Sequence, residues 1–190
     1  GLKLSHAVER FDVSVKDAVA IDVGCSTGGF TDVLLHNGAA KVYAVDVGYG
    51  QLAMKLRQDE RVVILERTNA RVLDRDLIPD APSVVVCDAS FISLKTVLPA
   101  ALRLCQPPAT LLALIKPQFE AKQAEVEDGT GVVRDEAVRK RVCDEIWSWL
   151  ETVGWEPKGI VPSSILGPSG NQEFIIYAML SSPMPEPENS

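Results

Sequence analysis

Short runs of β-branched and apolar residues alternate with stretches of helical periodicity along most of this chain, and that alternation limits its possible folds most strongly. The run Ser83 to Cys87 is almost wholly apolar, as expected for a central strand that is covered on both faces. Strands that alternate with helices form a mainly parallel sheet with helices on both faces, an α/β fold. Two late runs, Trp155 to Val161 and Phe174 to Leu180, are joined without a helix and predict an antiparallel hairpin at the sheet edge. The other expected strands are Val19 to Val23, Lys41 to Asp46, Val62 to Glu66 and Thr110 to Ile115.

The chain length fits one domain. With 190 residues the chain can bury a single sizeable core, and we assign residues 1–180 to that domain. The tail 181–190 contains three prolines and is expected to be disordered. The expected helices are Ser5 to Phe11 with Ser5 as its N-cap, Gly28 to Asn37, Leu52 to Gln58, Leu94 to Cys105 and Arg134 to Val153.

Composition and charge argue against several classes of function. The longest apolar stretch, around Thr110 to Ile115, is far shorter than a membrane span, and the first residues hold no apolar signal region, so we expect a cytoplasmic protein. The four cysteines form no CxxC pair and the two histidines are isolated, which predicts no metal site. Since the formal net charge is −7, this chain is not expected to hold RNA tightly by itself. The densest positive cluster, Arg139 to Arg141, fits a solvated helix face better than an RNA contact.

The strongest local motif is a glycine-rich loop that follows the first buried run and opens a helix. An acid two residues before the first glycine, followed by GxxxGG, is typical of methyltransferase glycine loops, and the acid can engage the cationic end of S-adenosylmethionine. The dinucleotide pattern is not met, because Ser26 stands where its second glycine belongs. The alternative is a tight turn without a ligand. The candidate cofactor residues in this loop are Asp22, Gly24, Cys25, Ser26, Gly28, Gly29 and Phe30.

Two further residues are candidates for binding the nucleoside part of a cofactor. Asp46 ends the second expected strand, where a carboxylate can accept hydrogen bonds from both ribose hydroxyls of an adenosine. NAD enzymes use the same arrangement, so Asp46 indicates a nucleoside without saying which. Asn69 follows the third strand and is placed to meet the adenine edge. The alternative for Asp46 is a helix or turn cap, and the alternative for Asn69 is a solvated loop asparagine.

Charged residues also end the next strands, at the edge where parallel sheets bind their ligands. Asp88 ends the fourth expected strand and Lys116 the fifth, while Glu173 precedes the last. Burying a lysine at the end of an apolar strand is costly without a partner or a purpose. Desolvation readily lowers the pKa of a lysine, so Lys116 is a candidate base. The alternative is a surface lysine that snorkels to solvent.

Together these motifs resemble the TlyA-like (hemolysin-like) branch of the FtsJ-type rRNA ribose 2′-O-methyltransferases. The matching runs occur in order along nearly the whole chain, which makes the set far more specific than the glycine loop alone. They are Gly1 to Leu4, Asp22 to Asp32, Val86 to Leu94, Leu114 to Glu120, Gly131 to Asp135 and Gly170 to Glu173.

The resemblance implies a Rossmann-like methyltransferase fold, a doubly wound and mostly parallel seven-stranded sheet with an antiparallel last strand. It also implies S-adenosylmethionine as cofactor, cofactor contacts from Asp88, and a Lys-Asp-Lys-Glu tetrad that methylates a ribose 2′-hydroxyl. By motif, the tetrad residues are Lys3, Asp88, Lys116 and Glu173. The implied partner is rRNA or a ribosomal subunit, bound mainly through an N-terminal RNA-binding domain that this chain is expected to lack.

Two alternatives from other classes stay open at this point. The hemolysin-like name suggests a membrane-interacting virulence protein, which an acidic chain without a basic amphipathic helix disfavours. Another nucleotide-binding enzyme on the same fold is the second alternative, and Ser26 disfavours NAD.

Overall fold

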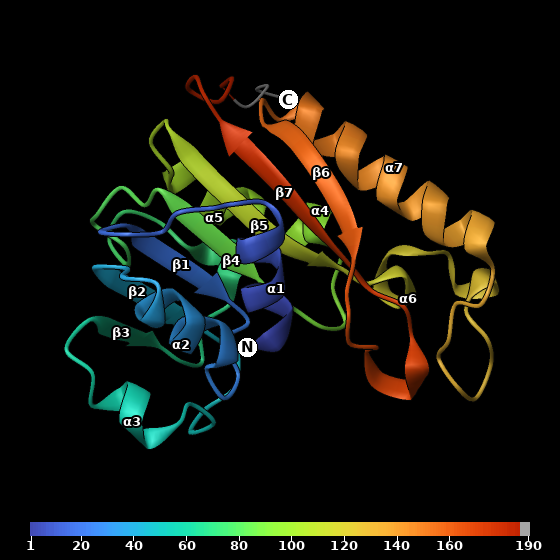
Figure 1. Ribbon diagram of the computed structural model, residues 1–190, viewed down its shortest axis with the longest axis horizontal. Helices are drawn as coiled ribbons and strands as arrows, with labels where there is room; N and C mark the ends of the chain where they lie inside the picture. Colours follow the sequence, from blue (N-terminus) through green and yellow to red (C-terminus); the bar gives the residue numbers. More distant parts are fainter. Residues whose placement is uncertain (187–190) are drawn as a thin grey trace.

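The computed structural model describes residues 1–186 and contains a seven-stranded sheet of order β3-β2-β1-β4-β5-β7-β6 (Figure 1). The parallel pairings run from β3 through β2, β1 and β4 to β5. The α/β prediction is thus confirmed. The strands are β1 (Val19–Val23), β2 (Lys41–Val45), β3 (Val62–Leu65), β4 (Val84–Cys87), β5 (Ala109–Ile115), β6 (Glu156–Pro162) and β7 (Phe174–Leu180).

The strand order reverses between β1 and β4. From β1 the chain builds outward to β2 and β3 and then returns to place β4 on the other side of β1. Val23 lies beside both Val45 and Cys87, so the three strands end at the same level. In open α/β sheets ligands bind beyond the carboxyl ends of the strands at such a reversal. The fold therefore predicts a site formed by the loops that follow β1, β2 and β4.

The hairpin of β6 and β7 closes the other edge of the sheet, as the sequence predicted. β7 lies between β5 and β6 and runs antiparallel to both. In the β5–β7 register Ile115 is opposite Phe174, so the residue after β5 and the residue before β7 are neighbours. This pairing brings Lys116 and Glu173 to the ligand edge together.

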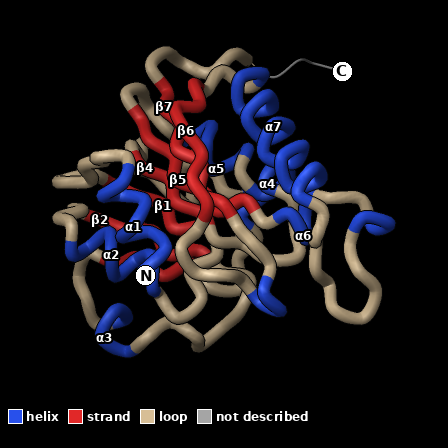
Figure 2. Tube along the Cα trace, turned by 45° about the vertical axis from the view of Figure 1, so that its right-hand side comes forward, coloured by secondary structure: helices blue, strands red, loops and turns tan. Residues whose placement is uncertain are grey.

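Helices cover the two faces of the sheet and create a separate apolar core on each (Figure 2). One face packs against α4 (Leu94–Val97), α5 (Pro99–Leu104) and α7 (Glu136–Thr152). The other face packs against α1 (Leu2–Arg10) and α2 (Gly29–His36). The shorter elements are α3 (Met54–Arg57), α6 (Pro117–Glu120) and the 3₁₀ turns η1 (Ala70–Val72), η2 (Gln123–Glu125) and η3 (Pro168–Gly170).

Two helix predictions are wrong in detail. The first helix begins at Leu2, with Gly1 as its N-cap, and the Ser5 amide already donates to the Gly1 carbonyl. Ser5 therefore lies inside the helix and does not cap it. The helix expected over residues 94–105 is divided into α4 and α5 at Pro99, because proline has no N–H for the carbonyl four residues earlier.

The chain continues past β7 as irregular structure. Within the segment predicted to be disordered, Met184 packs against the core on the α7 face. The rest of that prediction falls on residues 187–190, which lie outside the described residues. Across residues 1–186, no helix is long and apolar enough to cross a membrane. The same residues contain no cluster of three or more His, Cys, Asp or Glu side chains suited to a metal ion.

Candidate functional site

The glycine loop between β1 and α2 is held close to the loops that follow β2 and β4. The amides of Gly24 and Cys25 both donate to the Val45 carbonyl, at 2.9 and 3.0 Å. Gly24 has φ +79°, and a Cβ built on it would lie 2.5 Å from the Asp88 carbonyl oxygen. Glycine is required there because any larger residue would push the β1 and β4 loops apart.

Asp46 connects the end of β2 to the glycine loop. Its Oδ2 accepts a hydrogen bond from the Ser26 amide and its Oδ1 one from the Gly48 amide, both at 2.8 Å. A carboxylate offers about four acceptor positions, so Asp46 keeps capacity for two more donors. Ribose hydroxyls are donors of this kind.

A first cavity of about 440 Å³ lies beyond the ends of β1, β2 and β4. Candidate cofactor residues from the loops after β1, β2 and β4 line its wall, and Asn69 lies on the same wall. The Asn69 Oδ1 accepts from the Arg71 amide and caps η1, a structural role that the sequence did not predict for this residue. The predicted cofactor residues that line this cavity are Gly24, Ser26, Asp46, Asn69 and Asp88.

A second cavity of about 450 Å³ adjoins the first and shares Gly24, Ser26, Asp88 and Ser90 with it. It contains the two lysines of the predicted tetrad. The predicted residues that line it are Lys3, Gly24, Cys25, Ser26, Gly29, Phe30, Asp88 and Lys116. Burial raises the pKa of the Cys25 thiol to about 12, so it is a neutral group in this wall.

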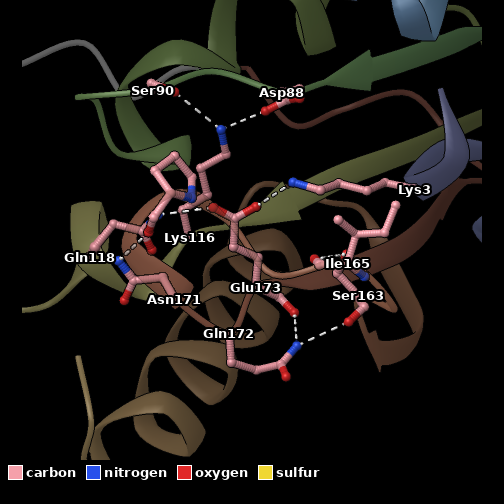
Figure 3. Close-up of polar contacts among 11 residues, drawn as sticks. Lys3, Asp88, Ser90, Lys116, Gln118, Ser163, Ile165, Asn171, Gln172 and Glu173 are labelled. Carbon is pink, nitrogen blue, oxygen red and sulfur yellow. Dashed lines mark hydrogen bonds and ion pairs between the residues drawn. The ribbon is translucent and has the colours of Figure 1, made fainter. Parts of the chain in front are cut away.

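The four tetrad candidates form two lysine–carboxylate pairs in one region (Figure 3). Lys116 Nζ lies 2.5 Å from Asp88 Oδ1, and Lys3 Nζ lies 2.9 Å from Glu173 Oε1. Lys116 is largely buried, with 8% of its side chain exposed, while Glu173 is fully buried. Each lysine thus has the anionic partner that makes a buried ammonium group tolerable.

Asp22 is placed differently from the other cofactor candidates. Its side chain is fully buried beneath the glycine loop and lines neither of the two cavities. The Thr31 hydroxyl donates to Oδ2 at 2.7 Å, whereas Oδ1 has no hydrogen-bond partner among the described residues. Burial, opposed by the Thr31 hydrogen bond and assisted by the charge of Asp88, raises the Asp22 pKa to about 7. Gly28 also lies off both cavities, packed against Leu52 and Leu56.

We expect the wild type to become less stable as pH rises, and we expect Asp22→Asn not to show this decrease. The folded-state pKa of about 7 lies above the ordinary 3.8, so the folded protein holds the proton more tightly than the unfolded chain. The stability of the wild type therefore falls as pH rises from 3.8 to about 7. Between pH 5 and pH 8, its unfolding free energy should decrease by about 2–3 kcal/mol more than that of Asp22→Asn. Urea denaturation at both pH values measures the drop, with exposed Asp76→Asn as control. Identical pH dependence in wild type and Asp22→Asn would contradict it.

Three residues next to the tetrad were not predicted. The Ser90 hydroxyl lies 3.1 Å from Lys116 Nζ, and Gln118 Nε2 donates to Glu173 Oε2 at 2.9 Å. Phe91 is 88% exposed at the rim of the first cavity, where its ring packs 4.9 Å from that of Phe119. All three stand inside the matching runs, but only the loop conformations show that they reach the site.

Comparison with known proteins identifies the family of this chain. Residues 1–179 match the FtsJ-like methyltransferase family. The chain belongs to the FtsJ-like methyltransferase family. Relatives of this family member include "Putative rRNA methyltransferase YqxC" of Bacillus subtilis, 49% identical over 93% of this chain and 63% of the relative. The "16S/23S rRNA (cytidine-2'-O)-methyltransferase TlyA" of Mycobacterium tuberculosis is 47% identical over 92% of this chain and 65% of the relative.

Solved structures show the same family resemblance. A "Putative hemolysin from Streptococcus thermophilus" superposes with a TM-score of 0.90 at 42% identity, over 95% of this chain and 65% of that chain. The chain thus spans less than two thirds of the length of these relatives. The prediction of a TlyA-like, FtsJ-type family is confirmed.

Proposed function

We propose that this protein transfers a methyl group from S-adenosylmethionine to a ribose 2′-hydroxyl of rRNA. The observation that carries the proposal is the Lys116–Asp88 pair: Asp88 lies on the wall shared by the two cavities, and Lys116 lines the second. A cofactor in the first cavity and a ribose in the second would meet at this wall. The named activities of the TlyA relative support rRNA as the substrate class.

The first cavity suits S-adenosylmethionine on the chemistry of its walls. Asp46 has free acceptor capacity for ribose hydroxyls, Asn69 offers an amide for the adenine edge, and Gly24 allows the backbone to approach a ligand closely. When bound, this cofactor supplies a methyl group on a sulfonium that an oxygen nucleophile can displace. Because Asp22 is fully buried, it would act on the cofactor from beneath the glycine loop and not from the cavity wall.

The tetrad residues would act on the acceptor hydroxyl. In its neutral amine form, Lys116 would orient the hydroxyl and accept its proton, with Asp88 and Ser90 holding the Nζ in place at 2.5 and 3.1 Å. The Lys3 ammonium, held by Glu173, would stabilise negative charge that develops on the oxygen. Alignment of hydroxyl and sulfonium would supply much of the acceleration, up to about 7–11 kcal/mol in favourable cases. The protein would act in the cytoplasm, where rRNA is found, with rRNA or a ribosomal subunit as partner and without a metal or a membrane.

The proposal is tested by incubating the protein with unmodified ribosomal subunits and S-adenosylmethionine. Mass-spectrometric mapping should then find a methyl group on a ribose of the RNA. Methyl groups on bases alone would contradict ribose methylation. Leakage of dye from lipid vesicles and binding of NAD, measured on the same preparation, examine the hemolysin-like and NAD-enzyme alternatives.

Asp46→Ala is expected to weaken S-adenosylmethionine binding. If the carboxylate accepts hydrogen bonds from the ribose hydroxyls, the loss should be about 1.5–3 kcal/mol of binding free energy. Isothermal titration calorimetry measures it, with exposed Asp76→Ala as the matched control. Binding by Asp46→Ala as tight as by the wild type would remove Asp46 from the cofactor site.

A further inference from the structure

Glu173 is held by two side chains from distant parts of the sequence (Figure 3). Its Oε1 accepts from Lys3 Nζ and its Oε2 from Gln118 Nε2, each at 2.9 Å. The carboxylate is fully buried, so water cannot replace either donor. Gln118 is therefore one of only two side chains among residues 1–186 that hold this carboxylate.

While the Gln118 amide nitrogen makes this contact, the oxygen of the same amide is left without a hydrogen bond. Gln118 Oε1 is buried and has no hydrogen-bond partner among the described residues. An unpaired buried acceptor destabilises a fold, and an apolar side chain of similar size would avoid it. Glu173 determines which way the amide faces, because an ionised carboxylate only accepts and would repel Oε1.

Gln118 also lies on a firmly held turn. It belongs to α6, which follows directly on Lys116, and the Phe119 amide donates to the Lys116 carbonyl at 2.9 Å. At the end of this turn Glu120 accepts from the Ser93 hydroxyl at 2.7 Å and from the Leu94 amide at 2.8 Å. The turn that carries Lys116 thus also carries the donor for Glu173.

We infer that Gln118 is a positioning residue of the methyl-transfer site. By holding Oε2 of Glu173, it directs Oε1 toward Lys3 and keeps the Lys3 ammonium at the cavity that contains Lys116. The inference rests on the proposed function, since methyl transfer to a hydroxyl gives that ammonium a developing negative charge to stabilise.

Gln118→Leu tests this inference, and Gln172→Leu is its matched control. Gln172 is next to Glu173, but its Nε2 donates only to backbone carbonyls, those of Ser163 at 3.2 Å and Glu173 at 2.7 Å. Acylation of the Lys3 amine by an N-hydroxysuccinimide ester is followed by mass spectrometry without RNA, with exposed Lys16 as the internal reference. In Gln118→Leu the Lys3 amine should react several-fold faster, and in Gln172→Leu at the wild-type rate.

Single-turnover methyl transfer is the second measurement. Gln118→Leu should slow it by about tenfold or more, the effect of losing one hydrogen bond to a charged group, while affinity for S-adenosylmethionine stays unchanged. Wild-type Lys3 reactivity in Gln118→Leu, or equal changes in both variants, would overturn the inference. Gln118→Met, unbranched and without a donor, gives the same comparison if the leucine variant does not fold. A wild type that transfers no methyl group would refute the proposed function, whereas the Lys3 reactivity would still decide the role of Gln118.

Discussion

Lys116→Ala is expected to abolish methyl transfer while leaving the affinity for S-adenosylmethionine nearly unchanged. The side chain lies at the end of β5 with its Nζ against Asp88, on the wall of the second cavity. It would therefore act on the acceptor hydroxyl and not on the cofactor. A general base contributes about 10²–10⁴-fold to a rate, and removal of the side chain also leaves Asp88 without its cation. Single-turnover transfer and calorimetry measure the two quantities.

Lys116→Arg separates a base from a positive charge. Arginine keeps the cation and can still pair with Asp88, but it does not deprotonate in proteins. We therefore expect this variant to fail as completely as Lys116→Ala. Full activity of the arginine variant would eliminate the base and leave electrostatic stabilisation. Full activity of the alanine variant would remove Lys116 from the mechanism, and with it the main support for ribose methylation.

Gly24→Ala is expected to have the largest effect on the scaffold of the site. The residue has φ +79°, and the added Cβ would lie 2.5 Å from the Asp88 carbonyl oxygen. The left-handed backbone costs about 1–2 kcal/mol for a residue with a Cβ, and the overpacking adds about 1–3 kcal/mol. The loss in unfolding free energy should thus be about 2–5 kcal/mol, measured by urea denaturation. Displacement of Asp88 should also slow methyl transfer by about 100-fold.

Gly50→Ala is the control for the backbone contribution. Gly50 has φ +75°, but a Cβ added there would have no atom within 4 Å. This variant should lose only the cost of the left-handed backbone, about 1–2 kcal/mol, and keep the position of Asp88. Equal losses in both variants would show that the close approach of the β1 and β4 loops is not what requires glycine at position 24.

The strands and the ligand edge could be predicted from the sequence because they depend on local patterns. Apolar runs such as β4 and β5 must be buried on both faces, and parallel strands bring their carboxyl ends to the same edge. Asp88 and Lys116 each follow such a run directly. Their placement at the same edge therefore follows from the pairing of β4 with β5, and the side chains complete it with 2.5 Å between Oδ1 and Nζ.

Contacts between distant segments were decided only by the tertiary structure. Lys3 and Glu173 are 170 positions apart, and the antiparallel register of β5 with β7 determines that Glu173 lies beside the end of β5. Family resemblance alone placed Lys3 in the site, whereas Glu173 was also expected there from its position just before the last strand. Gln118 gave no signal of its own, because the partner of an amide depends on which segments pack around it.

The position of Asp22 separates what a motif determines from what packing determines. The motif fixes an acid at the end of β1, and the sequence alone suggested that this acid faces the cofactor. In the structure its side chain is fully buried, accepts from Thr31 and lines neither cavity, and its contact with the cofactor stays a prediction. Burial and hydrogen-bond partners depend on residues far along the chain, so the sequence determined which residue types follow the strands at this edge, and tertiary packing determined which of them line the two cavities.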